Sequence, residues 1–81
     1  MEVRVLLFGP EADALGRREA PVEVREPVTC ARVKDALALA HPALTPYLPS
    51  GRLAINACFA APETPIAPGD EVALIGLVSG G

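Results

Sequence analysis

The last four residues, Val78-Ser79-Gly80-Gly81, are the part of this sequence best suited to chemistry. Glycine has no Cβ, so a Gly-Gly end can run extended through a channel that is too narrow for other residues. The Gly81 carboxylate is unhindered, and another enzyme can activate it to carry a transferred atom or to form a bond. At average composition any two neighbouring residues are both glycine about one time in 200. The interpretation of Gly80-Gly81 as a reactive end therefore needs support from the rest of the chain.

Histidine and cysteine do not assemble into a reactive site in this sequence. His41 is the only histidine and directly precedes Pro42, far from Cys30 and Cys58, so we expect it to be an exposed loop residue. No C-x-x-C pair is present, which leaves a zinc site without its closely spaced ligands, and two cysteines are too few for iron–sulfur ligation. We expect both cysteines to be small buried hydrophobes.

Other polar residues are also predicted to be structural. Asp13, Glu19 and Glu63 fall on polar stretches and should face solvent, and Asp70 should serve a turn before the last strand. Asn56 interrupts an apolar strand, where it either bonds to a partner or, as we favour, caps a neighbouring loop of the same domain. Neither glycine-rich nucleotide-binding pattern occurs, so activation of the terminal carboxylate is expected to depend on a partner.

Length and composition indicate one folded domain. The chain has 81 residues, 51% of them hydrophobic, and a formal net charge of −3. Its basic residues are scattered and outnumbered, which argues against nucleic-acid binding, whereas an acidic surface suits a partner with a basic face. No apolar run approaches the roughly 18 residues of a membrane span. The N-terminus lacks a signal-peptide pattern, so we expect a cytoplasmic protein.

Hydrophobic periodicity predicts the secondary structure. Alternation predicts strands over 3–7, 22–25, 53–59 and 71–75, with a short strand at Ile66. Thr29 is an expected N-cap for a helix over 30–40 that Pro42 ends, and its apolar stripe is Cys30, Val33, Leu37 and Ala40. Residues 10–19 are predicted to be a loop with at most a short helical turn, and residues 41–52 a loop. Pro68-Gly69 marks a turn.

This order of elements predicts a two-layer α+β domain, with a mixed sheet of four or five strands and one helix across one face. If the last strand pairs beside the first, the two run parallel and the helix lies in the crossover between them. We expect residues 1–76 to form this domain and residues 77–81 to be a flexible C-terminal tail.

Taken together, these segments resemble the small, sulfur-carrying subunit of molybdopterin synthase, a ubiquitin-like β-grasp family. The resemblance covers nearly the whole chain and rests on Leu7-Phe8-Gly9, Gly51-Arg52-Leu53, Asn56, Gly69-Asp70-Glu71-Val72-Ala73 and Val78-Ser79-Gly80-Gly81.

The chain departs from the family pattern in two places. The family usually has two prolines where Gly76-Leu77 stand, so the base of the tail should be less stiff. It often has an Arg-Glu pair where Ala12-Asp13 stand, so a contact made by that arginine would be missing.

The resemblance implies that a partner enzyme uses ATP to adenylate the Gly81 carboxylate, and that sulfur then replaces AMP to give a C-terminal thiocarboxylate. The tail would enter a pocket of the large synthase subunit and donate sulfur to a pterin precursor, building the dithiolene that holds molybdenum or tungsten. The chain itself would bind no cofactor and would be a non-catalytic subunit. Its partners would be the large subunit, an E1-like activating enzyme and a sulfur donor enzyme.

The resemblance also assigns roles to residues near the end of the chain. Gly81 would carry the sulfur, while Gly80 and the small spacer Ser79 would allow entry into the pocket. Leu77 and Val78 would pack at the mouth of the pocket, and Leu74 and Ile75 would extend an apolar docking surface.

Three other functions stay open at this point. The chain could carry sulfur for thiamine thiazole synthesis or tRNA thiolation, which uses the same tail chemistry. It could be conjugated to protein lysines, as ubiquitin is. It could also be a plain β-grasp interaction module whose glycine end is incidental.

Overall fold

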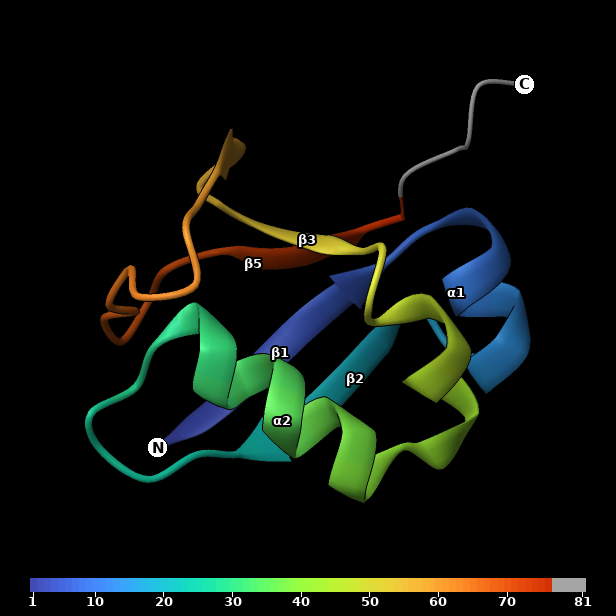
Figure 1. The fold of residues 1–81 in the computed structure, drawn as a ribbon, viewed down its shortest axis with the longest axis horizontal. Coiled ribbons are helices and arrows are strands. Elements are labelled where there is room, and N and C mark those ends of the chain that lie inside the picture. Colours follow the sequence, from blue (N-terminus) through green and yellow to red (C-terminus); the bar gives the residue numbers. More distant parts are fainter. Residues whose placement is uncertain (77–81) are drawn as a thin grey trace.

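A mixed sheet of five strands lies against helix α2 in the computed structural model, which describes residues 1–76 (Figure 1). The elements in chain order are β1 (Glu2–Leu7), α1 (Gly9–Leu15), β2 (Glu19–Glu23), α2 (Cys30–Ala40), the 3-10 helix η1 (Pro42–Tyr47), β3 (Arg52–Ile55), β4 (Cys58–Phe59) and β5 (Val72–Ile75). The strand order is β2-β1-β5-β3-β4.

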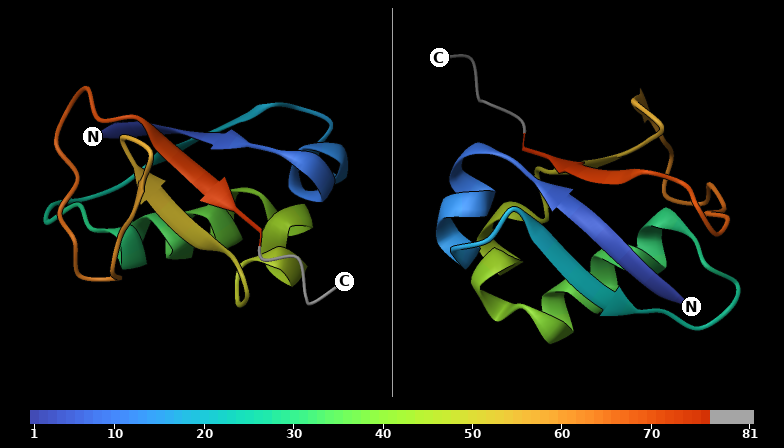
Figure 2. Two further views of the ribbon diagram at one scale, coloured as in Figure 1. Left: turned by 90° about the horizontal axis from the view of Figure 1, so that it is seen from above. Right: turned by 180° about the vertical axis from the view of Figure 1, so that it is seen from behind.

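The first and last strands pair in parallel at the centre of the sheet. Val5 lies opposite Val72 and Leu7 opposite Leu74, whereas the β1–β2, β3–β5 and β3–β4 pairs are antiparallel. A parallel pair needs a long crossover connection, and α2 lies within it. The predicted fold, a ubiquitin-like β-grasp with a mixed sheet and one main helix on one face, is confirmed (Figure 2).

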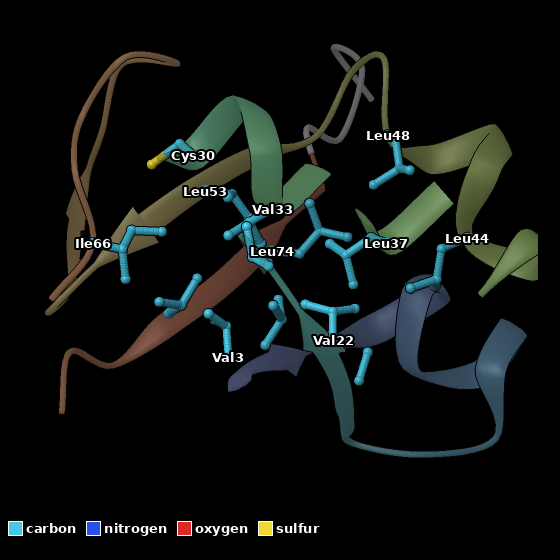
Figure 3. Close-up of a cluster of buried hydrophobic side chains, with 14 of the residues drawn as sticks. Val3, Val22, Cys30, Val33, Leu37, Leu44, Leu48, Leu53, Ile66 and Leu74 are labelled. Carbon is cyan, nitrogen blue, oxygen red and sulfur yellow. The ribbon is translucent and has the colours of Figure 1, made fainter. Parts of the chain in front are cut away.

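The core lies between α2 and one face of the sheet. Cys30, Val33 and Leu37 of α2 are buried, as the apolar stripe predicts, but Ala40 in the last helical turn is exposed. Successive strand residues point to opposite faces, so every second residue of β1 and β5 faces the helix. These inward side chains pack against the buried residues of α2 and of the other elements (Figure 3). The strand residues of the core include Val5, Leu53, Val72 and Leu74.

Both ends of α2 follow their sequence signals. The Thr29 hydroxyl accepts a hydrogen bond from the Arg32 amide at 3.3 Å, which satisfies one of the amides left open at a helix start. At the other end the His41 amide donates to the Leu37 carbonyl at 2.8 Å, and Pro42 prevents the helix from continuing.

Two segments that were predicted as loops are helical. Residues 9–15 form α1, which has Pro10 in its first turn and ends at Gly16 in the left-handed conformation (φ 72°). Residues 42–47 form η1, which buries the Leu44 side chain completely. Both helices are too short to show a clear helical period, and the prolines of η1 resemble loop signals; burial of a few apolar side chains decides their structure.

The predicted strand over 53–59 is a hairpin. Asn56 and Ala57 have φ values of 51° and 69°, and Ile55 pairs with Cys58 across them. Positive φ at both central residues is the geometry of a tight two-residue turn. The turn reverses the chain, which leaves the Cys58 thiol exposed, so the expectation that both cysteines are buried holds only for Cys30.

The second strand begins earlier than predicted and contains Pro21. Proline is tolerated there because β2 is at the edge of the sheet, where one side of the strand needs no ladder partner. The His41 ring lies 3.0 Å (Nε2) from the Pro21 carbonyl oxygen, so this histidine is half-buried and not the exposed loop residue expected. Ile66 is buried beside an isolated bridge between Thr29 and Pro65, not in a strand.

Candidate functional site

The predicted carrier residues follow directly after the central strand β5. Leu77, Val78, Ser79, Gly80 and Gly81 lie outside the described residues 1–76. The structure therefore describes the base from which they leave and the surface around it. β5 runs parallel to β1, and both strands end on the side where α1 begins (Figures 1 and 2).

The two residues expected to extend a docking surface point in opposite directions. Leu74 has no exposed surface and packs in the core, so its proposed docking role is wrong. Leu74 lies opposite Leu7 and Leu53, so its side chain faces α2. Sequence periodicity alone did not show which face of this strand is turned towards the helix. Ile75 is half-buried and belongs to the opposite, helix-free face.

Small side chains form a row across that helix-free face. Leu6 lies opposite Ala73, Ala73 opposite Ala54, and Ala54 opposite Phe59, so the row crosses four strands. Ala54 and Ala73 are buried yet do not belong to the core cluster, which lies on the other side of the sheet. The two alanines thus form a low apolar floor.

Two exposed aromatic side chains stand beside this floor. Phe8 is 53% and Phe59 54% exposed, although large apolar side chains usually avoid water. An open hollow of about 310 Å³ lies here, lined by Phe8, Ala54, Ala57, Phe59, Glu71, Ala73 and Ile75. We call these seven residues the docking face.

Sequence reasoning missed most of the docking face. It treated Phe8 as the end of a strand and placed Phe59 on the same face as Leu53, because it did not detect the hairpin turn at Asn56. A usable signal was present: Phe8 and Phe59 are the only phenylalanines in the chain, and both stand at strand ends.

Charged groups frame the docking face. The Arg52 guanidinium carbon lies 4.7 Å from the centre of the Phe59 ring, a cation–π contact that holds the ring in place. Glu71 adds an acidic group to the lining. The site is therefore apolar at its centre, with an acidic group at Glu71 and a basic group at Arg52. This arrangement fits a partner that offers an apolar side chain flanked by charges of the complementary signs.

A buried acid lies against the base of the C-terminal segment. Glu11 of α1 is only 4% exposed, which is unusual for a carboxylate. A Cβ built on Gly76 would overlap the Glu11 Oε1 atom and approach its Cδ to 2.8 Å. Gly76, one of the two departures from the family pattern, thus leaves room for an acidic side chain from the first helix.

Asn56 connects two turns near the docking face. Its side-chain amide donates to Asp70 Oδ1 at 3.1 Å, and its side-chain oxygen accepts from the Glu71 amide at 3.0 Å. Asp70 also accepts from the Ala67 amide at 2.8 Å. The predicted role of Asn56 in capping a loop of its own domain is confirmed, and so is the role of Asp70 in the turn.

The hydrogen bonds to Asp70 change its acidity. Those from the Ala67 amide and from the Asn56 side chain both favour the ionised carboxylate, so they lower the pKa of Asp70 below its ordinary value of 3.8. Burial, followed by the nearby Glu63 charge, raises the pKa of the Cys30 thiol. A raised thiol pKa disfavours the thiolate, so Cys30 is not an activated nucleophile.

Other kinds of site were searched for in the described part of the chain. Within residues 1–76, no group of three His, Cys, Asp or Glu side chains is placed to hold a metal ion. None of the helices described there is long and apolar enough to cross a membrane. Asp13, Glu19 and Glu63 are exposed, as expected.

The geometry can be compared with known proteins. The family model of ThiS matches residues 5–81. The structure of SAMP1 from Haloferax volcanii is 32% identical, with a TM-score of 0.84 and complete coverage of both chains. No curated protein matches the sequence.

Two more distant structures share the fold. Molybdopterin converting factor subunit 1 from Pyrococcus furiosus is 17% identical, with a TM-score of 0.80, and the match covers 96% of this chain and 99% of that one. A complex of subunits 1 and 2 of molybdopterin-converting factor from Helicobacter pylori matches at 23% identity and a TM-score of 0.70, with complete coverage of both chains.

Proposed function

The chain belongs to the ThiS family of ubiquitin-like sulfur carriers, and on that premise we propose that it is the sulfur-carrying subunit of a molybdopterin synthase. The observation that carries the sulfur-carrier role is the extent of the family match, which runs to residue 81 and so includes Val78-Ser79-Gly80-Gly81. The molybdopterin assignment is supported by the likeness of the fold to two molybdopterin converting factor structures. Gly81 is the proposed carrier residue.

The proposed cycle has three steps. An activating enzyme uses ATP to convert the Gly81 carboxylate to an acyl adenylate, with release of pyrophosphate. A sulfur donor enzyme then supplies sulfur at the oxidation level of hydrosulfide, which attacks the acyl carbon and displaces AMP to give a thiocarboxylate. The loaded end enters the large subunit, where its sulfur forms a C–S bond with a pterin precursor. Water then cleaves the acyl–sulfur bond and restores the carboxylate, and a second cycle completes the dithiolene. Nucleotide binding and acid–base catalysis belong to the partners.

The docking face supports a large-subunit partner. Its apolar hollow lies on the helix-free side of the sheet and includes Ile75, the last residue of β5. A partner that covers this face therefore lies next to the base of residues 77–81. The Helicobacter pylori relative of this fold is described as a complex of two subunits, which favours the same type of assembly here.

Reconstitution distinguishes the sulfur-carrier pathways. The chain, loaded as the thiocarboxylate, is mixed with a molybdopterin synthase large subunit and the pterin precursor, and pterin dithiolene is measured. We expect product in proportion to the loaded chain, and none with a variant lacking Gly81. If a loaded chain yields no dithiolene but sulfurates a thiazole or a tRNA precursor, the molybdopterin assignment is wrong while the carrier role stands.

A second function is favoured by one comparison. SAMP1 of Haloferax volcanii, 32% identical to this chain, is also described as a small archaeal modifier protein. The same activated Gly81 could then be transferred to amines of other proteins. Tagged chain recovered in covalent adducts with other proteins would favour this function, whereas tagged chain recovered only as free carboxylate or thiocarboxylate would favour the carrier.

A further inference from the structure

The chain has two amines of its own, the Met1 ammonium and one lysine. The Met1 ammonium donates to Glu23 Oε2 at 3.1 Å and to the Val24 carbonyl oxygen at 2.9 Å. Its seven basic residues are one lysine, Lys34, and six arginines. All six arginines are exposed: Arg4, Arg17, Arg18, Arg25, Arg32 and Arg52. The lysine is half-buried. Residues 1–76 therefore present their exposed side-chain cations only as guanidinium groups.

Lys34 is held within the fold. Its Nζ atom donates to the Gly51 carbonyl oxygen at 3.0 Å, which ties α2 to the start of β3. Gly51 is buried, and its own amide donates to the Tyr47 carbonyl oxygen at 2.9 Å. The acceptor of the Lys34 ammonium is therefore a hydrogen-bonded part of the backbone.

This arrangement matters because an activated carboxyl end is an acylating agent. A neutral amine attacks the carbonyl carbon of an acyl adenylate, forming a C–N bond and breaking the bond to AMP, and the amine loses one proton to solvent. Guanidinium groups stay protonated at neutral pH and do not compete. A lysine whose ammonium donates to a carbonyl must first break that bond and lose a proton.

Resting on the proposed function, we propose that the described domain is built to be a poor acceptor of its own activated end. Exposed arginines and a tethered Lys34 keep side chains of a second copy from consuming the adenylate, which leaves it for the sulfur donor or for an amine on another protein. The chain would accordingly act as a single unit and would not form lysine-linked polymers of itself.

The first test needs no activating enzyme. Wild-type chain and the variant Arg32→Lys, which places a lysine on the exposed face of the same helix, are treated with the N-hydroxysuccinimide ester of acetate, and acetylation at each position is followed by peptide mass spectrometry. We expect position 34 to react roughly tenfold more slowly than position 32 of the variant, because a charge-assisted hydrogen bond must break first. Equal rates would overturn the proposal.

The second test uses the carrier chemistry. Both proteins are incubated with an adenylate-forming activating enzyme and ATP without a sulfur donor. Amide-linked dimers are counted after treatment with hydroxylamine, which cleaves any thioester formed through the exposed Cys58 but leaves amides intact. We expect dimers linked through position 32 of the variant and none through Lys34. Lys34-linked dimers of the wild type, or a loaded variant without dimers, would overturn the proposal.

The two tests separate the proposals. If neither protein is loaded by the activating enzyme, the proposed function fails, while the acetylation rates still decide whether Lys34 is protected.

Discussion

At the scale of single residues, Asn56 has the most connections near the docking face. It occupies a left-handed position in the β3–β4 turn and joins that turn to the one before β5 through Asp70 and Glu71. Asparagine suits both demands, because it tolerates positive φ and its amide both donates and accepts.

Two substitutions of Asn56 separate the contribution of its side-chain hydrogen bonds from that of its tolerance of positive φ. Asn56→Gly keeps the left-handed geometry but loses the side-chain hydrogen bonds, and we expect it to lower the free energy of unfolding by about 1–2 kcal/mol. Asn56→Ala should cost about 1 kcal/mol more, because alanine is strained at positive φ. Urea denaturation measures both values, and equal stabilities of the two variants would contradict this reading of the turn.

Asp70 gives the fold an acid-sensitive contact. Because the folded-state pKa is lower than the ordinary value of 3.8, Asp70 contributes stability at pH values above 3.8 that is lost as the pH falls through the folded-state pKa. The free energy of unfolding of the wild type should therefore fall more steeply between about pH 5 and pH 2 than that of Asp70→Asn. Parallel curves for the two proteins would show that the carboxylate contributes nothing.

At the scale of elements, the junction between η1 and β3 leaves no room for a side chain at Gly51, because one of the two nearest atoms belongs to the backbone. Gly51→Ala places a Cβ against Leu74 Cδ1 and the Tyr47 carbonyl oxygen. We expect a loss of about 1–3 kcal/mol in the free energy of unfolding, as for other overpacked cores. Ser50→Ala, an exposed neighbour, is the control and should change stability little; similar losses in both variants would contradict the steric argument.

The elements also show how far sequence reasoning reaches. The helix over 30–40 has an N-cap, an apolar stripe and a terminating proline, and these local signals predicted α2 within its observed bounds. The β1 and β5 strands were predicted from alternation. Their parallel direction followed from the crossover on the condition that the two strands pair, and the structure shows that they do. The fold was thus predictable because its central elements carry strong, local and mutually consistent patterns.

The candidate site was less predictable because it depends on a turn and on register. Asn56-Ala57 lacks the glycine that usually marks a two-residue hairpin, so the reversal was missed, and the positions of Cys58 and Phe59 were missed with it. Leu74 and Ile75 are adjacent in a strand and so point to opposite faces. Because both are apolar, the sequence did not show which of them faces the core. The contact between Glu11 and Gly76 joins residues far apart in the chain and has no local signal.

At the scale of the whole molecule, the two faces of the sheet have different tasks. One face is closed by α2 and holds the core (Figures 2 and 3). The helix-free face presents the docking face around Ala54 and Ala73. The base of residues 77–81 adjoins the second face. The proposed function therefore assigns recognition to the side of the sheet opposite the core, and on that proposal stability and recognition can be changed separately.

A matched pair of variants tests this division. Phe59→Asp places a charge beside the hollow, whereas Leu39→Asp places one on α2, where the leucine is 85% exposed. We expect Phe59→Asp to weaken binding to a large subunit by at least about 2 kcal/mol, as for an aromatic anchor of an interface, and Leu39→Asp to leave it unchanged. Binding is measured by calorimetry and folding by circular dichroism. Equal affinities would exclude this face as the interface.

The central claim is that Gly81 carries sulfur. The most direct measurement is the intact mass of the chain after incubation with an activating enzyme, ATP and a sulfur donor. We expect replacement of one carboxylate oxygen by sulfur at Gly81, and no such change when Gly81 is deleted or when one residue is added after it. An unchanged mass, under conditions in which SAMP1 or another ThiS-family chain is loaded, would show that Gly81 does not carry sulfur.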